Sequence, residues 1–195
     1  MSIPLPPPQE TPLTRLLRER RSIRRYSNKP ISLLELSYLL WAAYGRVGDR
    51  YTVPSAGATY PSKIYVVAER VEGLGQGIYF YDTDTHSLKT VKHGSYGSQL
   101  ANACLGQRCV RDAAANIVVA AIPEKTTAWY GERGLRYVYM EAGHIGQNIY
   151  LGATELGLGT VAVGAFNDEE VAKILDLGEG EIVLYIFPVG RPREG

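Results

Sequence analysis

The chain has 195 residues, which is enough for one domain with a substantial hydrophobic core. Its 21 Lys and Arg residues nearly balance its 20 Asp and Glu residues, so no overall field favours nucleic acid or an anionic membrane surface. The two cysteines form no Cys-x-x-Cys pair, which argues against a disulfide framework or a zinc site and predicts a reducing, cytoplasmic location. No export signal and no apolar run of about 18 residues is visible.

The first part of the chain predicts a proline-rich arm followed by helices. Four of the eleven prolines fall in the first eight residues, so we expect an extended arm over 1–11 and a single domain over 12–195. Leucines recur at helical spacing after Pro12. The sequence Ser-Leu-Leu-Glu at 32–35 has the pattern of a capping box, which predicts a helix from there to about Tyr44.

The rest of the chain predicts strands that alternate with helices. The expected strands are 64–68, 77–81, 88–91, 116–122, 160–163 and 182–189. The expected helices are 96–108, 135–156 and 167–175. The run 116–122 is continuously apolar and β-branched, which is typical of a central strand, and 135–156 would be the longest helix. The pattern predicts an α+β domain with helices on a central sheet.

The side chains offer few routes to catalysis without a cofactor. His86, His93 and His144 are too few and too scattered for a metal site or a Ser-His-Asp triad. The glycines at 157–159 fit a dinucleotide-binding pattern, but they follow a predicted helix and lead into a strand, so a glycine helix cap is the preferred interpretation. Redox chemistry would therefore come from a bound cofactor, and a ligand-binding domain without catalysis is the alternative.

An arginine-rich segment, Arg-Glu-Arg-Arg-Ser-Ile-Arg-Arg at 18–25, is the most unusual local feature. It ends a predicted helix, where Ser22 and several guanidinium groups can converge, and Arg191 and Arg193 follow the last strand. Guanidinium groups bind phosphate through paired hydrogen bonds, so these residues could hold a phosphate in a nearly neutral protein. A solvated basic surface is the other interpretation.

Ordered motifs along nearly the whole chain carry a family resemblance. Residues 20–26, Arg-Arg-Ser-Ile-Arg-Arg-Tyr, resemble the opening motif of FMN-dependent nitroreductases, and 54–61 resemble their second motif as found in the SagB-type dehydrogenase branch. Residues 130–137 are similar to the most specific signature of that branch. The remaining matches are 141–144, 147–148, 157–159, 163–166 and 189–192. On these motifs the chain is identified as a member of the nitroreductase superfamily.

The resemblance implies a nitroreductase-like fold, with a central mixed, mainly antiparallel sheet flanked by helices in an intertwined homodimer. The two flavin sites would lie between the subunits. The predicted helix 135–156 has apolar or small residues on more than one face, which favours a helical dimer interface. The residues that suggest this interface are Leu135, Val138, Ala142, Ile145, Ile149 and Ala153.

The resemblance also implies an FMN site and assigns residues to it. These are Arg20, Arg21, Ser22, Arg24, Pro54, Ser55, Ala56, Gly57, Gln107, Val163, Gly164, Ala165, Arg191 and Arg193. Residues 20–22, with Arg191 and Arg193, are expected at the phosphate and ribityl chain, and Arg24 at the N1 and O2 edge of the ring. Gln107 is expected at the pyrimidine edge. Residues 163–165 are expected to pass along the ring, and 54–57 to come from the other subunit.

The implied activity is hydride transfer through flavin N5, with NADH or NADPH as reductant and a nitroaromatic or quinone as acceptor. Azoline-oxidising members of the branch carry Lys-Tyr before Gly-Glu-Arg, whereas this chain has Trp129-Tyr130, which argues against oxidation of peptide azolines. Tyr130 is the candidate acid or base, and Lys125 would substitute only if its loop folds back. Trp129 and Tyr130 could instead form an aromatic lid. Azoline oxidation and a non-catalytic flavin-binding module remain the alternatives.

Overall fold

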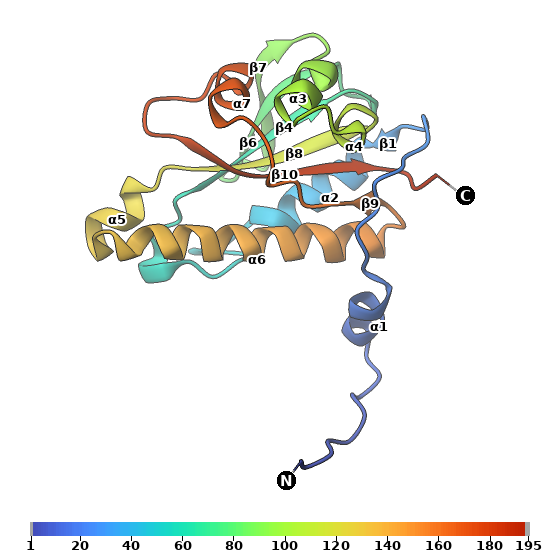
Figure 1. Cartoon of the computed structure of the whole chain (residues 1–195), viewed down its shortest axis with the longest axis vertical. Helices are drawn as coiled ribbons and strands as arrows, with labels where there is room; N and C mark the ends of the chain where they lie inside the picture. Colours follow the sequence, from blue (N-terminus) through green and yellow to red (C-terminus); the bar gives the residue numbers. More distant parts are fainter. Residues whose placement is uncertain (1, 194–195) are drawn as a thin grey trace.

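A computed structural model describes residues 2–193, and its centre is a six-stranded sheet of order β7-β6-β4-β8-β10-β9 (Figure 1). The strands are β4 (Ser62–Ala68), β6 (Gly77–Asp82), β7 (Ser87–His93), β8 (Ala115–Ala121), β9 (Gly159–Thr160) and β10 (Ile182–Gly190). All neighbouring strands of this sheet pair antiparallel. The prediction of a mixed sheet was therefore wrong, because the parallel pair of the described chain, β1 (Ile31–Ser32) with β5 (Val71–Glu72), forms a separate sheet. A third small sheet pairs β2 (Arg46–Val47) with β3 (Arg50–Tyr51).

Helices cover both faces of the sheet, so the molecule is α+β with two cores (Figure 1). The helices are α1 (Pro12–Glu19), α2 (Leu33–Tyr44), α3 (Gly97–Ala103), α4 (Arg108–Arg111), α5 (Glu124–Tyr130), α6 (Arg133–Glu155) and α7 (Asp168–Leu175). Successive β4 side chains alternate between the cores: Ile64 and Val66 pack with α2 and α6, whereas Tyr65 and Val67 pack with α3 and α7. A strand buried on both faces is continuously apolar, which explains the pattern that predicted β8.

The capping box at the start of α2 is confirmed. The Ser32 hydroxyl accepts a hydrogen bond from the Glu35 N–H at 3.2 Å, and the Ser32 N–H donates to the Glu35 carboxylate at 2.7 Å. That carboxylate also accepts from Arg191 Nη2, 3.0 Å from each oxygen. Partial burial alone would raise the pKa of Glu35, but the hydrogen bonds from Ser32 and the charge of Arg191 outweigh it and lower the pKa. Glu35 therefore ties the start of α2 to the end of β10.

Replacing Glu35 with glutamine is expected to lower the free energy of unfolding by about 1–2 kcal/mol at neutral pH, since a cap and an ion pair both weaken. The folded-state pKa of Glu35 is lowered, so its contribution is present at neutral pH and is lost as pH falls through that pKa. Urea unfolding at neutral and acidic pH measures the difference. Glu179→Gln, at an exposed loop residue, is the control. Equal losses for both variants at every pH would contradict the role of Glu35.

The long helix expected over 135–156 is confirmed as α6, which spans the 23 residues 133–155, but most of the residues expected at a dimer interface lie elsewhere. Val138, Ala142, Ile145, Ile149 and Ala153 are at most 2% exposed within this one chain, so they cannot form the surface of a dimer. They pack in the core of their own chain because α6 lies directly on the sheet. An ideal Cβ on Gly146 would sit 2.6 Å from Cζ of Phe187, and glycine alone permits this close approach.

Two other elements differ from prediction. The helix expected over 96–108 is broken into α3 and α4, because Leu105 and Gly106 adopt left-handed conformations with φ of 58° and 73°. The strand expected over 160–163 is reduced to β9 and an isolated bridge between Val163 and Ile186. Gly157 follows α6 with φ of 66° and β9 comes next, so the helix-cap interpretation of these glycines is confirmed.

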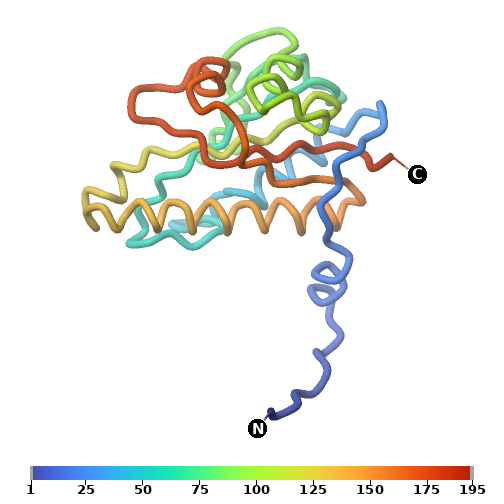
Figure 2. The backbone as a smooth tube through the Cα atoms, in the orientation of Figure 1, coloured from blue at the N-terminus to red at the C-terminus, as the bar shows by residue number. Residues whose placement is uncertain are grey.

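Residues 2–11 form neither helix nor strand, and together with α1 they extend away from the body of the molecule (Figure 2). Thr11 accepts a hydrogen bond from the Thr14 N–H at 3.1 Å and so caps α1 at Pro12. Across the described residues, none of the helices is both long and apolar enough to cross a membrane.

Candidate active site

The sequence-predicted site residues fall into two sets at opposite ends of α6 (Figure 1). The arginine loop 20–25 contacts Tyr150 near the C-terminal end, whereas α5 packs against Gly134 near the N-terminal end. Tyr150 and Gly134 are 16 residues apart (150 − 134), or about 24 Å along a helix axis. One chain therefore cannot bring both sets around one ligand.

Tyr150 organises the loop that follows α1. The Arg20 guanidinium lies over its ring, 5.0 Å from the centroid, and its hydroxyl is 2.9 Å from that of Ser22. The same hydroxyl accepts a hydrogen bond from the Ala162 N–H at 2.8 Å. Tyr150 thus fixes the loop 20–22 against the segment after β9, although its local sequence gave no signal that it belongs to the site.

Two contacts hold the rest of this loop close to the sheet. The Ile23 N–H donates to the Thr160 carbonyl at 2.9 Å, and an ideal Cβ on Gly159 would lie 2.7 Å from the Ile23 side chain. Tyr26 is buried and donates to the carbonyls of Ile23 at 2.7 Å and Pro188 at 3.0 Å. Burial raises the pKa of the Tyr26 phenol, so it stays neutral and serves as an anchor. With Tyr26 pointing inward, the arginines beside it lie exposed.

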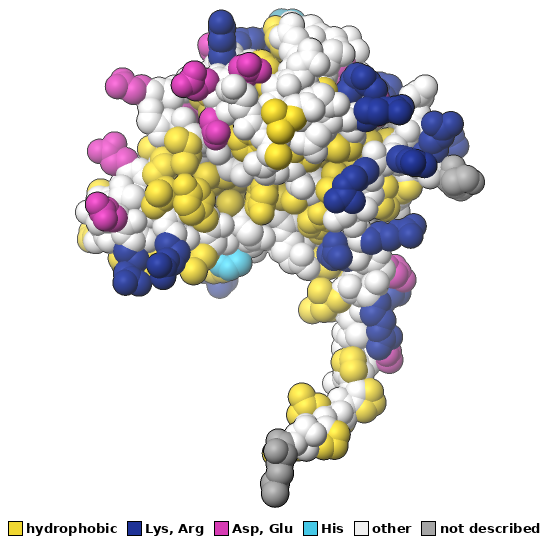
Figure 3. Space-filling model, in the orientation of Figure 1, with side chains coloured by type: hydrophobic (Ala, Val, Ile, Leu, Met, Phe, Trp, Pro, Cys, Tyr) yellow, Lys and Arg dark blue, Asp and Glu magenta, His cyan; other side chains and the backbone are white. Residues whose placement is uncertain are grey.

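A cavity of about 750 Å³ opens beside this anchor, and arginines dominate its lining. The lining residues are Arg24, Arg25, Tyr26, Gln107, Arg108, Cys109, Asp112 and Arg193. Ligand pockets usually measure about 300–1,000 Å³, so the cavity has room for a cofactor ring. Figure 3 shows that most basic side chains on this face gather on the side that carries the C-terminus, whereas most acidic ones lie on the opposite side. The chain is nearly neutral as a whole, but its positive charge is concentrated on this side.

Gln107 connects this cavity to the segment after β9. Its side-chain amide donates to the Ala165 carbonyl at 3.0 Å, which brings two predicted site segments together. Gly164 and Ala165 are exposed, and within residues 2–193 their N–H groups have no partner. The Val163 N–H instead donates to the Ile186 carbonyl at 2.8 Å and cannot be offered to a ligand. Two free backbone donors thus remain beside the cavity.

The two C-terminal arginines have different surroundings. Arg191 Nη2 binds Glu35 and its Nε donates to the Pro30 carbonyl at 3.2 Å, so these donors serve the fold. The Arg193 N–H donates to the Arg25 carbonyl at 3.0 Å, which places Arg193 at the cavity. The prediction that joined Arg191 to the phosphate-binding arginines stays a prediction, but the structure gives that side chain another partner.

The second set of residues surrounds Tyr130 at the far end of α6. Gly57 has φ of 58°, and an ideal Cβ on it would lie 2.6 Å from the Tyr130 hydroxyl. The hydroxyls of Thr59 and Thr126, 2.8 Å apart, link the loop 54–61 to α5. The side chain of Tyr130 is 39% exposed. The loop 54–61 and Tyr130 therefore form one surface within a single chain, and this surface is exposed to a second molecule.

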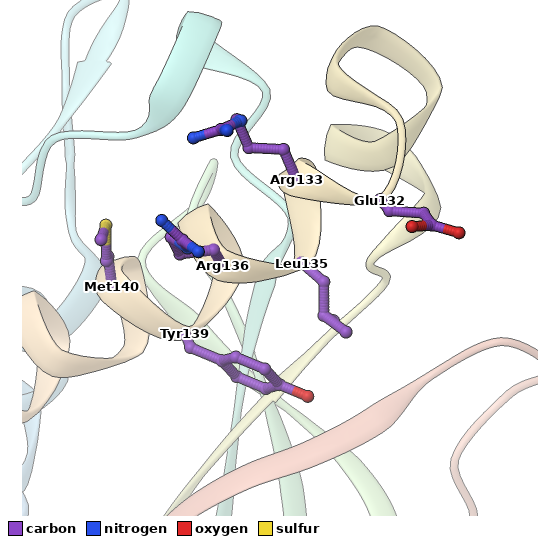
Figure 4. Close-up of a pocket in the computed structure, with 6 residues that line it drawn as sticks. All are labelled: Glu132, Arg133, Leu135, Arg136, Tyr139 and Met140. Carbon is purple, nitrogen blue, oxygen red and sulfur yellow. The ribbon is translucent and has the colours of Figure 1, made fainter.

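The outward face of α6 lies between the two sets and carries exposed apolar residues. Leu135 is 36% exposed, Tyr139 55% and Met140 53%, and Trp129 at the end of α5 is 81% exposed. Leu135, Tyr139 and Met140 line a shallow hollow, where the side chains spread outward from successive turns of the helix (Figure 4). The lining residues are Glu132, Arg133, Leu135, Arg136, Tyr139 and Met140. These residues replace the buried ones as the candidate contact surface.

The cysteines do not add a nucleophile to the site. Cys109 lines the cavity, Cys104 is buried, and neither forms a disulfide. Burial raises the pKa of both thiols, that of Cys104 to about 12. Both are therefore protonated at neutral pH and unreactive. The cavity offers cations, amides and backbone donors, which suit the binding of an anionic cofactor.

The family model described as "Nitroreductase family" matches residues 17–191. The chain belongs to the nitroreductase family. The match includes the arginine loop, both ends of α6, β10 and all of the cavity lining except Arg193.

Relatives of this nitroreductase agree with that assignment. A Methanocaldococcus jannaschii protein provisionally named a nitroreductase is 47% identical over 196 residues, covering 100% of this chain and 98% of the relative. A nitroreductase-like structure from Anabaena variabilis has a TM-score of 0.83 and 31% identity, and the match covers 93% of this chain but 38% of that longer chain. The Escherichia coli microcin synthetase McbBCD complex contains a chain with a TM-score of 0.81 and 23% identity, covering 97% of this chain and 76% of that one. This last likeness shows the fold alone.

Proposed function

We propose that this nitroreductase binds FMN in the arginine-lined cavity and transfers hydride from NADH or NADPH to small acceptors such as quinones and nitroaromatics. The observation that carries the proposal is the convergence, inside the family fold, of Arg24, Gln107 and Arg193 from three distant segments on one cavity. Bound FMN would supply the hydride-accepting ring. The chain supplies binding, orientation and charge.

The residues have distinct roles in this proposal. Arg20, Arg21 and Ser22 bind the phosphate and ribityl chain, because the loop that carries them is fixed by Tyr150. Arg24 stabilises negative charge at the N1 and O2 edge of the ring. Gln107 and the free N–H groups of 164–165 hydrogen-bond ring atoms. Val163 supports that segment from the sheet.

The two C-terminal arginines, Arg191 and Arg193, have different roles. Arg193 supplies a cation to the cofactor site, since it lines the cavity. Arg191 supports the site indirectly, by fixing the end of β10 to Glu35.

We propose that two copies of the chain complete each site. Pro54, Ser55, Ala56 and Gly57 lie with Tyr130 about 24 Å of helix away from the arginine loop of their own chain. Antiparallel packing of two α6 helices about a two-fold axis would bring each set next to the other copy's complementary set. The exposed Leu135, Tyr139 and Met140 would lie in that interface. The division of the site into two distant sets supports the proposed homodimer.

Tyr130 would then face the ring from the second copy. Its hydroxyl, close to Gly57, could give a proton to a reduced acceptor, and Trp129 beside it could cover a flat aromatic acceptor. These roles favour quinones and nitroaromatics as substrates.

The proposal is tested by the colour of the purified protein and its response to reductant. We expect a yellow protein that releases FMN on denaturation, is bleached by NADH or NADPH without oxygen, and recovers its colour when a quinone is added. A colourless protein that does not bind added FMN would overturn the proposal. Bound FMN that neither nucleotide bleaches would instead indicate a flavin-binding module without catalysis.

Oxidation of peptide azolines is a second candidate, and the structure of α5 favours it in one respect. Lys125 and Trp129 lie four residues apart on α5, so they share one face of that helix without any folding back of a loop. Lys125 is therefore available at the end of α6 that carries Tyr130. Efficient oxidation of an azoline peptide, abolished by Lys125→Ala, would favour this activity over quinone reduction.

A further inference from the structure

The cavity lining carries more positive than negative charge. Four arginines line it, Arg24, Arg25, Arg108 and Arg193, against the single carboxylate of Asp112. That carboxylate is shared, at 3.7 Å from Arg108 Nε and 3.1 Å from Arg111 Nε. In the described chain, Arg24, Arg25 and Arg193 form no ion pair. Arg24 and Arg193 have roles in the proposed FMN site, which leaves Arg25 and Arg108 without one.

Arg25 and Arg108 are exposed residues of the cavity lining. Gln107 is half-buried and its side-chain amide donates to Ala165, whereas the side chain of Arg108, the next residue, is 78% exposed. Arg25 is also exposed, and its carbonyl accepts the hydrogen bond from Arg193. A long ligand whose reactive end lies at the half-buried Gln107 could therefore extend its distal end to these two exposed arginines.

A reduced nicotinamide nucleotide has this shape. Its nicotinamide must meet the flavin ring, and its adenosine half extends outward. NADPH differs from NADH only by a 2′-phosphate on that adenosine, a phosphomonoester with a charge of about −1.5 to −2 at neutral pH. Guanidinium groups bind such a group through paired, charge-assisted hydrogen bonds.

We propose that Arg25 and Arg108 form a subsite for the 2′-phosphate and make NADPH the preferred reductant. This inference rests on the proposed function. Two exposed guanidinium groups from different segments line one cavity, and its single carboxylate, Asp112, is shared with Arg111 and does not balance their charge. A terminal phosphomonoester would supply the missing charge.

Steady-state kinetics with both nucleotides test the subsite. The unmodified protein should have kcat/KM for NADPH at least about 10-fold above that for NADH, the effect of a charge-assisted hydrogen bond. Arg25→Ala and Arg108→Ala should each lower the NADPH value about 10-fold while changing the NADH value less than about 2-fold. Arg50→Ala is a matched control, because Arg50 also has a 78% exposed side chain beside one aspartate.

Calorimetric titration of the FMN-loaded protein with NADP⁺ and NAD⁺ gives a readout that does not depend on turnover. NADP⁺ should bind more tightly, and the difference should disappear in Arg108→Ala and return in part in Arg108→Lys. Equal binding of NADP⁺ and NAD⁺ by the unmodified protein would overturn the subsite. Loss of FMN from Arg25→Ala or Arg108→Ala would also overturn it, by assigning these arginines to the flavin. If the protein binds no FMN at all, the proposed function itself fails.

Discussion

A folded but colourless protein is the expected result when Arg20 and Arg24 are both replaced by alanine. Arg20 is held over Tyr150 beside Ser22, and Arg24 lines the cavity, so the two side chains would contact different parts of FMN. Loss of two charge-assisted hydrogen bonds should raise the dissociation constant for FMN at least about 100-fold. Fluorescence titration of the apoprotein with FMN measures this change.

The control for this experiment is Arg15→Ala with Arg18→Ala on α1. These two arginines lie outside both the loop 20–25 and the cavity lining, and they pair with Glu19 and Glu10. The double change removes the same charge as the test variant but should leave FMN binding nearly unchanged. Equal loss of FMN in both variants would show that a general positive field, rather than a built site, binds the cofactor.

Replacing Tyr139 and Met140 with glutamate is expected to give a monomer without FMN. Both side chains are more than half exposed on the outer face of α6, where the second copy would pack. Burying two unpaired carboxylates in that interface costs several kcal/mol each, so dimer dissociation should increase at least about 1,000-fold. Light scattering and flavin absorbance measure mass and cofactor together.

Leu105→Glu is the matched control for the interface. Leu105 is 73% exposed, but it lies between α3 and α4, on the other face of the sheet from α6. This variant should remain a yellow dimer. A stable, FMN-loaded monomer of the Tyr139 and Met140 variant would contradict the proposed division of the site.

The elements that were predicted correctly depend on residues close together in the sequence. The capping box at Ser32 and Glu35 needs only residues three positions apart, and β8 needs only its own apolar run. The break between α3 and α4 was missed because it depends on left-handed backbone at Leu105, a residue that rarely adopts it. α5 was missed as well, since its seven residues carry no clear apolar period.

The sequence predicted which segments belong to the site, but not which of them meet in space. The arginine loop and Arg193 were found from residue type, but their meeting at one cavity depends on the backbone pairing of Arg193 with Arg25. The second partner of Arg191, Glu35, is 156 residues away in sequence, so composition could not show that its donors were engaged. Which face of α6 is buried likewise depends on the sheet beneath it, and the periodicity alone could not separate core from interface.

Subunit complementation tests the central claim, that each site is built from two copies, most directly. One variant lacks the arginines (Arg20→Ala with Arg24→Ala), and the other carries Gly57→Leu, which clashes with Tyr130 and strains a residue with φ of 58°. Each variant alone should be inactive. After random reassociation half of the dimers are mixed, and each of these has one intact site of two, so about one quarter of the normal quinone reductase activity should return. Mixed dimers, verified by native mass spectrometry, that regain no activity would contradict the shared site.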